Sequence, residues 1–122
     1  MYKLSKYDII FSEIMSVFPR EMVHIVDGEN LIKRPHEEIV HVENFLQLKQ
    51  FYRKEYFYVG PKGFPCFSVQ GSTRCMENDK GRKHPKITES FSKKLHDFFG
   101  PNMRQFANMS GVHFKWLRDN YS

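Results

Sequence analysis

The chain has 122 residues, 40% of them hydrophobic and 27% charged, so it fits one folded domain and not an intrinsically disordered protein. No apolar run approaches the ~20 residues that span a bilayer, and Met1–Asp8 lacks the apolar centre of a signal peptide. We therefore expect any targeting segment upstream. The formal charge of +5 favours polyanions such as sulfated glycans, phosphate groups, nucleic acids or acidic membranes, but it also fits an ordinary soluble surface.

The first half of the chain predicts helices around one buried strand. Apolar spacing predicts a first helix that Pro19 ends, and the apolar run Met22–Val26 is typical of a strand in a parallel sheet. Asp27 can begin a helical turn, and Pro35 suits the first position of the next helix. A lone parallel strand needs neighbours, so we expect an α/β fold whose parallel sheet is incomplete within these residues.

The second half predicts a short aromatic strand at Tyr56–Val59 and then a long basic loop from Gly60 to Pro85. Thr88 is expected to cap a helix, which Gly100-Pro101 would end. A short helix should follow up to Gly111. In the tail, apolar and polar residues alternate around Phe114 and Trp116, which predicts an extended segment.

The chemistry is concentrated in the basic loop. Lys80-Gly81-Arg82 puts two cations around a glycine, which suits a phosphate clamp, although three such residues also fit a solvated basic turn. Cys66 and Cys75 are compatible with a disulfide or with two reduced thiols. The chain has no Cys-x-x-Cys and no His at ligand spacing, so no metal site is expected.

One ordered pattern is more specific than its parts. Lys62-Gly-Phe-Pro-Cys66, then Cys75, then Lys80-Gly-Arg-x-His-Pro85 resembles the carboxy-terminal part of heparan sulfate glucosamine 3-O-sulfotransferases. The sulfotransferase domain of the N-deacetylase/N-sulfotransferases fits less well. Further positions agree along most of the chain, whereas Val112 replaces the family's usual Arg; the agreeing positions include Asp27, Gly28, Glu29, Leu31, Arg34, Pro35, Phe57, Tyr58, Phe106, Gly111, Phe114 and Trp116.

The resemblance implies a disulfide between Cys66 and Cys75 and a sulfate donor, 3′-phosphoadenosine 5′-phosphosulfate. It also implies that Arg74 faces the sulfated glycan, with Lys62 as a weaker candidate for that role. The same resemblance places a donor-binding segment over the nucleotide, in which Lys80 and Arg82 make the charged contacts and Gly81 the close backbone approach; its residues are Lys80, Gly81, Arg82, Lys83 and His84.

The resemblance assigns no catalytic residue to this chain. The family's general base, its Lys-rich phosphate loop and its Arg/Ser pair for the 3′-phosphate would all lie upstream of Tyr2, and Glu13, Glu21 and Glu29 do not match the base. We therefore expect residues 1–122 to be the carboxy-terminal part of a sulfotransferase domain that transfers no sulfate alone. The parent enzyme would work without a metal in the Golgi lumen, anchored through an upstream segment.

Two other functions compete with the sulfotransferase reading. The same basic loop could serve a non-catalytic module that binds heparin or other polyanions. Nucleic acid is a less suitable partner, because the cations cluster in a Gly/Pro-rich loop and no DNA- or RNA-binding signature occurs. Asn108-Met-Ser110 is a formal N-glycosylation acceptor that agrees with a luminal protein, but such triplets often arise by chance.

Overall fold

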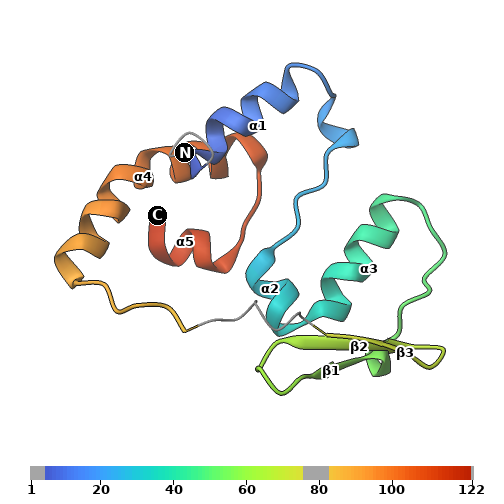
Figure 1. The fold of residues 1–122 in the computed structure, drawn as a ribbon. Helices are drawn as coiled ribbons and strands as arrows, with labels where there is room; N and C mark the ends of the chain where they lie inside the picture. The colour runs from blue at the N-terminus through green and yellow to red at the C-terminus, as the bar shows by residue number, and fades with distance from the viewer. Residues whose placement is uncertain (1–4, 76–82, 122) are drawn as a thin grey trace. The chain divides into compact units, whose positions relative to one another are not determined.

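The computed structural model describes residues 5–75 and 83–121, which form two compact units. Unit 1 joins Met1–Ile25 to Pro85–Ser122, and unit 2 is Val26–His84. The described residues are α/β, as the sequence predicts (Figure 1). The elements in chain order are α1 Tyr7–Met15, η2 Arg20–Met22, α2 Gly28–Lys33, α3 Pro35–Phe45, η3 Lys54–Tyr56, β1 Phe57–Val59, β2 Pro65–Val69, β3 Ser72–Arg74, α4 Glu89–Ser110 and α5 Lys115–Tyr121.

Unit 1 is built on α4, which packs against α1 on one side and α5 on another (Figure 1). Its buried cluster consists of Phe11, Met103, Phe106 and Leu117. The Phe106 ring meets the Phe11 ring edge-on, with 5.7 Å between centroids, an arrangement that aromatic pairs favour. The predicted first helix is confirmed, with Phe11 as its buried ring, but α1 ends at Met15 and not at Pro19.

Two polar side chains fix α1 and the segment after it onto α4. The carboxylate of Asp8 is buried and accepts hydrogen bonds from Asn102 Nδ2 at 3.0 and 2.8 Å. Arg20 Nη2 donates to the backbone oxygen of Ser110 at 2.9 Å, where α4 ends and its carbonyls lack helical partners. Both contacts satisfy groups that would otherwise be costly to bury.

The helix expected to stop at Gly100-Pro101 does not stop there. α4 continues for 22 residues through Pro101, so the prediction of two shorter helices is wrong. Proline removes one helical hydrogen bond, but its fixed φ is compatible with a helix, and packed residues on both sides hold α4 together. Gly100 is buried, and a Cβ there would lie 3.3 Å from Arg104 Nη1 and at an ordinary contact distance of 3.8 Å from Tyr121 of α5.

The predicted ends of α4 are confirmed, and the predicted tail is not. Thr88 accepts a hydrogen bond from the Phe91 backbone N–H at 3.3 Å, and α4 ends at Gly111 with φ of 68°. The tail forms the helix α5 and not an extended segment, so Trp116 lies in a helix. Leu117 of α5 is buried against α4, which explains why tertiary packing overrides the alternating pattern.

Unit 2 begins with the helices α2 and α3. Asp27 caps α2, since its carboxylate accepts from the backbone N–H groups of Glu29 at 3.0 Å and Asn30 at 3.2 Å. Pro35 is the first residue of α3, as predicted. The chain then forms a three-stranded sheet of order β1-β2-β3.

The sheet differs from the expected one in place and direction. Residues 23–26 lie in no strand, so the prediction of a buried strand at Met22–Val26 is wrong. Its residues other than His24 are apolar and Val23 is extended, but a strand also needs a neighbouring backbone to pair with. β1 at Phe57–Val59 confirms the short aromatic strand predicted at Tyr56–Val59, whereas β2 and β3 lie inside the predicted loop. The described strands pair antiparallel and not parallel.

Candidate functional site

The candidate site is built on the antiparallel hairpins of unit 2. β2 pairs with β1 through Tyr58 opposite Cys66, and with β3 through Phe67 opposite Arg74. The turn between β2 and β3 consists of Gln70 and Gly71, with φ of 49° and 80°. Two consecutive left-handed residues match the twist of a two-residue hairpin and fix its register.

The predicted disulfide is confirmed. Cys66 and Cys75 are bonded, with 4.4 Å between their Cα atoms. Continuing the register from the pair Phe67–Arg74 puts Cys75 directly opposite Cys66, at the short separation of a pair without backbone hydrogen bonds. Cys66 is 2% exposed, whereas Cys75 is exposed, so only the Cys66 half of the bridge is buried.

Gly60 is in close contact with the bridge. A Cβ placed on this residue would lie 2.5 Å from Cys66 Sγ and 3.3 Å from the Phe64 carbonyl oxygen. The Gly60 N–H also donates to that oxygen at 2.8 Å, which closes the turn between β1 and β2. The absence of a side chain at Gly60 therefore lets the turn and the disulfide occupy the same space.

We expect Gly60→Ala to destabilise unit 2 by about 1–3 kcal/mol, because the added methyl group must displace the disulfide or the turn. Gly28→Ala is the matched control, since a Cβ there meets nothing within 4 Å. Urea unfolding followed by circular dichroism measures both variants. Equal stability of the two variants would contradict the close packing inferred for Gly60.

Arg74 and Lys62 are exposed at this sheet. Side chains alternate between the faces of a sheet, so Arg74 shares a face with Phe57 and Phe67 and points away from the face of Cys66. No ion pair of Arg74 is found among the described residues. β3 runs towards the same end of the sheet as the turn containing Lys62, so the chain leaves Cys75 at that end.

Only part of the predicted donor-binding segment can be placed. Lys80, Gly81 and Arg82 lie outside the described residues. Lys83 and His84 belong to unit 2 and are exposed, without helix or strand structure. Exposed cations can approach an anion without first losing buried partners, which suits the predicted role of Lys83.

A hollow of about 300 Å³ in unit 2 was not predicted from the sequence. Its lining combines aromatic rings of β1 with basic residues at the corner between α2 and α3, among them Lys33, Arg34, Phe57 and Tyr58. Arg34 and Lys33 already form ion pairs with Glu37 and Glu29, at 3.3 and 3.4 Å, which weakens their attraction for a further anion. Arg34-Pro35 and Phe57-Tyr58 are among the positions that agree with the family pattern. The sequence alone does not show that these two pairs of residues line one hollow.

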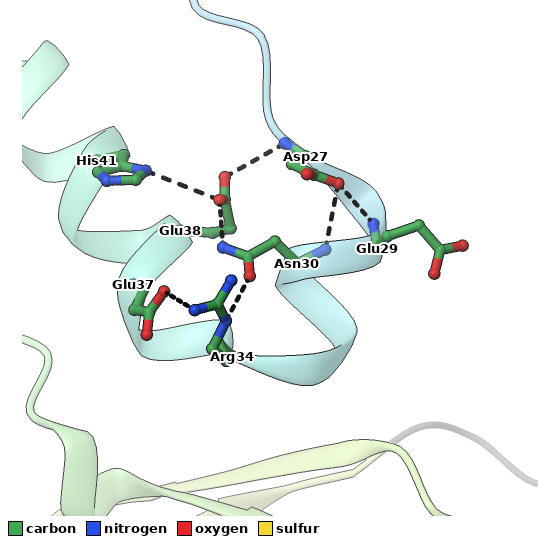
Figure 2. A network of polar contacts seen from close by, with 7 residues as sticks. All are labelled: Asp27, Glu29, Asn30, Arg34, Glu37, Glu38 and His41. Carbon is green, nitrogen blue, oxygen red and sulfur yellow. Dashed lines mark hydrogen bonds and ion pairs between the residues drawn. The ribbon is translucent and has the colours of Figure 1, made fainter. Parts of the chain in front are cut away.

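A polar network fixes the corner beside this hollow (Figure 2). Glu38 of α3 is 5% exposed, and its carboxylate accepts from the Asp27 backbone N–H at 3.2 Å and from Asn30 Nδ2 at 2.7 Å. His41 Nδ1 lies 3.7 Å from the same carboxylate. The Glu38 carboxylate thereby joins the start of α2 to α3, so we assign Glu38 a structural role.

Neither a metal site nor a membrane-spanning helix is found in the part of the chain that the structure describes. In residues 5–75 and 83–121, no group of three or more His, Cys, Asp or Glu side chains is arranged to hold a metal ion. None of the helices that the structure describes combines the length and apolar character needed to cross a membrane.

Comparison with known proteins gives a consistent result. The family model of the sulfotransferase domain matches residues 6–107. Human heparan sulfate glucosamine 3-O-sulfotransferase 6 is 37% identical over 103 residues, and its mouse counterpart is 39% identical. Mouse heparan sulfate glucosamine 3-O-sulfotransferase 5 is 34% identical over 105 residues. The alignments cover 81% of this chain for the first two and 84% for the third, but only 30% of each relative, so the chain spans about 30% of their length.

Proposed function

Since this chain belongs to the sulfotransferase domain family, we propose that it forms a donor- and glycan-binding part of an enzyme that sulfates heparan sulfate. The acceptor would be a glucosamine, at its 3-O position, as the names of the similar human and mouse proteins suggest. The observation that carries the proposal is the bridge between Cys66 and Cys75, which fixes the sheet from which the Lys80–His84 segment continues.

The reaction would move a sulfuryl group in line from 3′-phosphoadenosine 5′-phosphosulfate to a sugar hydroxyl. The bond from sulfur to the phosphate oxygen breaks, a bond from sulfur to the sugar oxygen forms, and the hydroxyl proton leaves to a base. By analogy with phosphoryl transfer, positioning and charge stabilisation supply most of the catalysis. We expect the present residues to supply positioning and charge only, and the 122 residues alone to transfer no sulfate.

The donor contacts are proposed for the basic segment. Lys80 and Arg82 would bind phosphate oxygens with charge-assisted hydrogen bonds, and Gly81 would allow a phosphate to approach the backbone. Lys83 and His84 would extend this contact along the nucleotide. The exposure of Lys83 and His84 supports their availability for an anion.

The glycan contact is proposed for Arg74, with Lys62 as a weaker candidate. Arg74 is exposed beside Phe67, which is 37% exposed on the same sheet face. A guanidinium group can bind a sulfate or carboxylate with two parallel hydrogen bonds, and a neighbouring ring offers an apolar surface to a sugar. This pairing supports a glycan partner over a featureless polyanion.

We place the parent enzyme in the Golgi lumen, anchored through a segment outside the present sequence. The disulfide supports an oxidising compartment, because structural disulfides are rare where thiols are kept reduced. Heparan sulfate as substrate agrees with the same compartment.

We expect Arg74→Ala to weaken binding of a heparan sulfate oligosaccharide about tenfold, since one charge-assisted contact is worth about 1.4 kcal/mol or more. Binding of 3′-phosphoadenosine 5′-phosphate should be unchanged. Lys115→Ala removes the same charge from an exposed position in unit 1 and should leave glycan affinity within about twofold. Calorimetric titration at fixed salt measures these affinities.

The same titrations separate the competing functions. Heparan sulfate binding without any nucleotide binding would favour a non-catalytic polyanion-binding module. Binding of duplex DNA as tight as that of heparan sulfate would remove the case for a glycan partner. Sulfate transfer by the purified 122-residue chain would overturn the proposal that these residues supply positioning and charge only.

A further inference from the structure

We propose that Asn108 is an N-glycosylation site and that it is modified before the carboxy-terminal end of α4 folds. Asn108-Met109-Ser110 fits the acceptor pattern, in which a hydroxyl two residues on assists the asparagine. The proposed sulfotransferase function does not use this triplet. The inference shares with that function only the assumption that the chain enters the secretory lumen.

The position of Asn108 suits a permanent glycan. Its side chain is exposed on α4, while Met103 and Phe106 of the same helix face the core. No hydrogen bond of the Asn108 side chain is found among the described residues. Asn108 also borders a hollow of about 290 Å³ that Arg104 and Phe114 help to line, so the first sugar meets open space and not packed side chains.

The hydroxyl of the same triplet is inaccessible in the folded protein. Ser110 is 4% exposed, and its Oγ donates to the Phe106 carbonyl oxygen at 2.7 Å. The Val112 backbone N–H donates to that Oγ at 3.4 Å. A transferase that must contact the Ser110 hydroxyl can reach it only before this end of α4 forms, which fixes the order of modification and folding.

The reaction needs an oligosaccharide carried on a lipid diphosphate. Asn108 Nδ2 forms a bond to the anomeric carbon of the first N-acetylglucosamine, and the bond from that carbon to the diphosphate oxygen breaks. The lipid diphosphate leaves with the electron pair, and Nδ2 loses one proton. The amide keeps its remaining hydrogen, and no oxidant or reductant takes part.

The compartment has independent support from unit 2. A disulfide between Cys66 and Cys75 is expected where proteins are oxidised, and N-glycosylation belongs to the same secretory route. Asn120-Tyr121-Ser122 is a second acceptor triplet and a natural comparison. In the folded protein Asn120 Nδ2 donates to the Trp116 carbonyl oxygen at 2.7 Å, a side-chain contact within α5 of a kind that Asn108 lacks among the described residues.

Import into microsomes tests whether Asn108 is modified. The full chain, directed by a cleavable signal peptide, should show a mobility shift that an N-glycosidase removes. Asn108→Gln should abolish the mobility shift that a glycan on Asn108 causes. Asn120→Gln should leave that mobility shift unchanged. Peptide mass spectrometry of protease-protected chains identifies the modified residue. Protected, disulfide-bonded chains with unmodified Asn108 would overturn the proposal while leaving the sulfotransferase assignment intact.

A solubilised oligosaccharyltransferase with its lipid-linked donor tests the order of events. The folded chain should be modified at Asn108 at least tenfold more slowly than Phe11→Ala, which removes a buried ring of the unit 1 core and leaves the triplet unchanged. Asn108→Gln should unfold at the same temperature as the unchanged protein, because this side chain is exposed. Equal rates for the folded chain and a demonstrably unfolded Phe11→Ala chain would contradict the proposed order.

Discussion

Replacing both Cys66 and Cys75 with serine should lower the free energy of unfolding of unit 2 by about 2.7 kcal/mol. Without the bridge, the unfolded chain regains the conformational entropy that the closed loop takes from it. The bond joins two residues that are 9 positions apart in the sequence. These two residues lie opposite each other when the register of β2 and β3 is continued by one pair. We also expect weaker donor binding, since the basic segment continues from Cys75. Urea unfolding and nucleotide titration measure the two effects.

Reduction provides the control for the serine variant. A reducing agent should shift the unfolding midpoint of the unchanged protein towards that of the double variant and should leave the double variant where it was. If neither the double serine substitution nor the reducing agent lowered the stability, the hairpin turns would hold the sheet without the bridge.

Phe106→Ala should destabilise unit 1 by about 3–5 kcal/mol, the range for removing a buried phenylalanine ring. Phe106 is 6% exposed and contacts Phe11 of α1 edge-on. It also contacts Tyr7 at 5.6 Å between centroids, so its loss opens a cavity between α1 and α4. Because a domain of this size has only about 5–15 kcal/mol of stability, the change should lower the melting temperature strongly.

Phe91→Ala is the matched control on the same helix. Phe91 is 50% exposed, so its truncation should change the stability by less than about 0.5 kcal/mol. Differential scanning calorimetry compares the two variants. Similar losses for Phe106→Ala and Phe91→Ala would contradict the core assigned to unit 1.

Features set by neighbours in the sequence could be predicted. Asp27 caps α2, Pro35 begins α3, Thr88 caps α4, and Gly111 ends it, because each depends on the hydrogen bonds or backbone angles of a few adjacent residues. The disulfide was implied by a family resemblance, and the structure confirms it.

Features set by distant residues could not be predicted. Gly100-Pro101 is a breaker by local rules, but contacts of α4 with α1 and α5 keep the helix continuous. Met22–Val26 has the composition of a strand without a paired partner among the described residues. Phe114 and Trp116 alternate in sequence, yet Trp116 lies in the helix α5, where its neighbour Leu117 is buried in the core of unit 1.

The chemistry of the candidate site stays a prediction from the sequence, and its geometry could not be predicted. Lys62, Arg74 and the Lys80–His84 segment were chosen for charge and motif, and the sheet face of Arg74 depends on the register set by Gln70-Gly71. The contact between Gly60 and the disulfide follows only from three-dimensional structure. The burial of Glu38 likewise depends on Asp27 and Asn30.

Calorimetric titration of the chain with 3′-phosphoadenosine 5′-phosphate tests the central claim, that the basic segment after the bridged hairpin binds the donor nucleotide. Lys80→Ala combined with Arg82→Ala should weaken binding about a hundredfold or more, because two charge-assisted contacts of about 1.5 kcal/mol each are lost. Lys93→Ala combined with Lys94→Ala removes the same charge from exposed positions on α4 and should have little effect. Equal weakening by both pairs, or unchanged affinity without Lys80 and Arg82, would contradict the assignment.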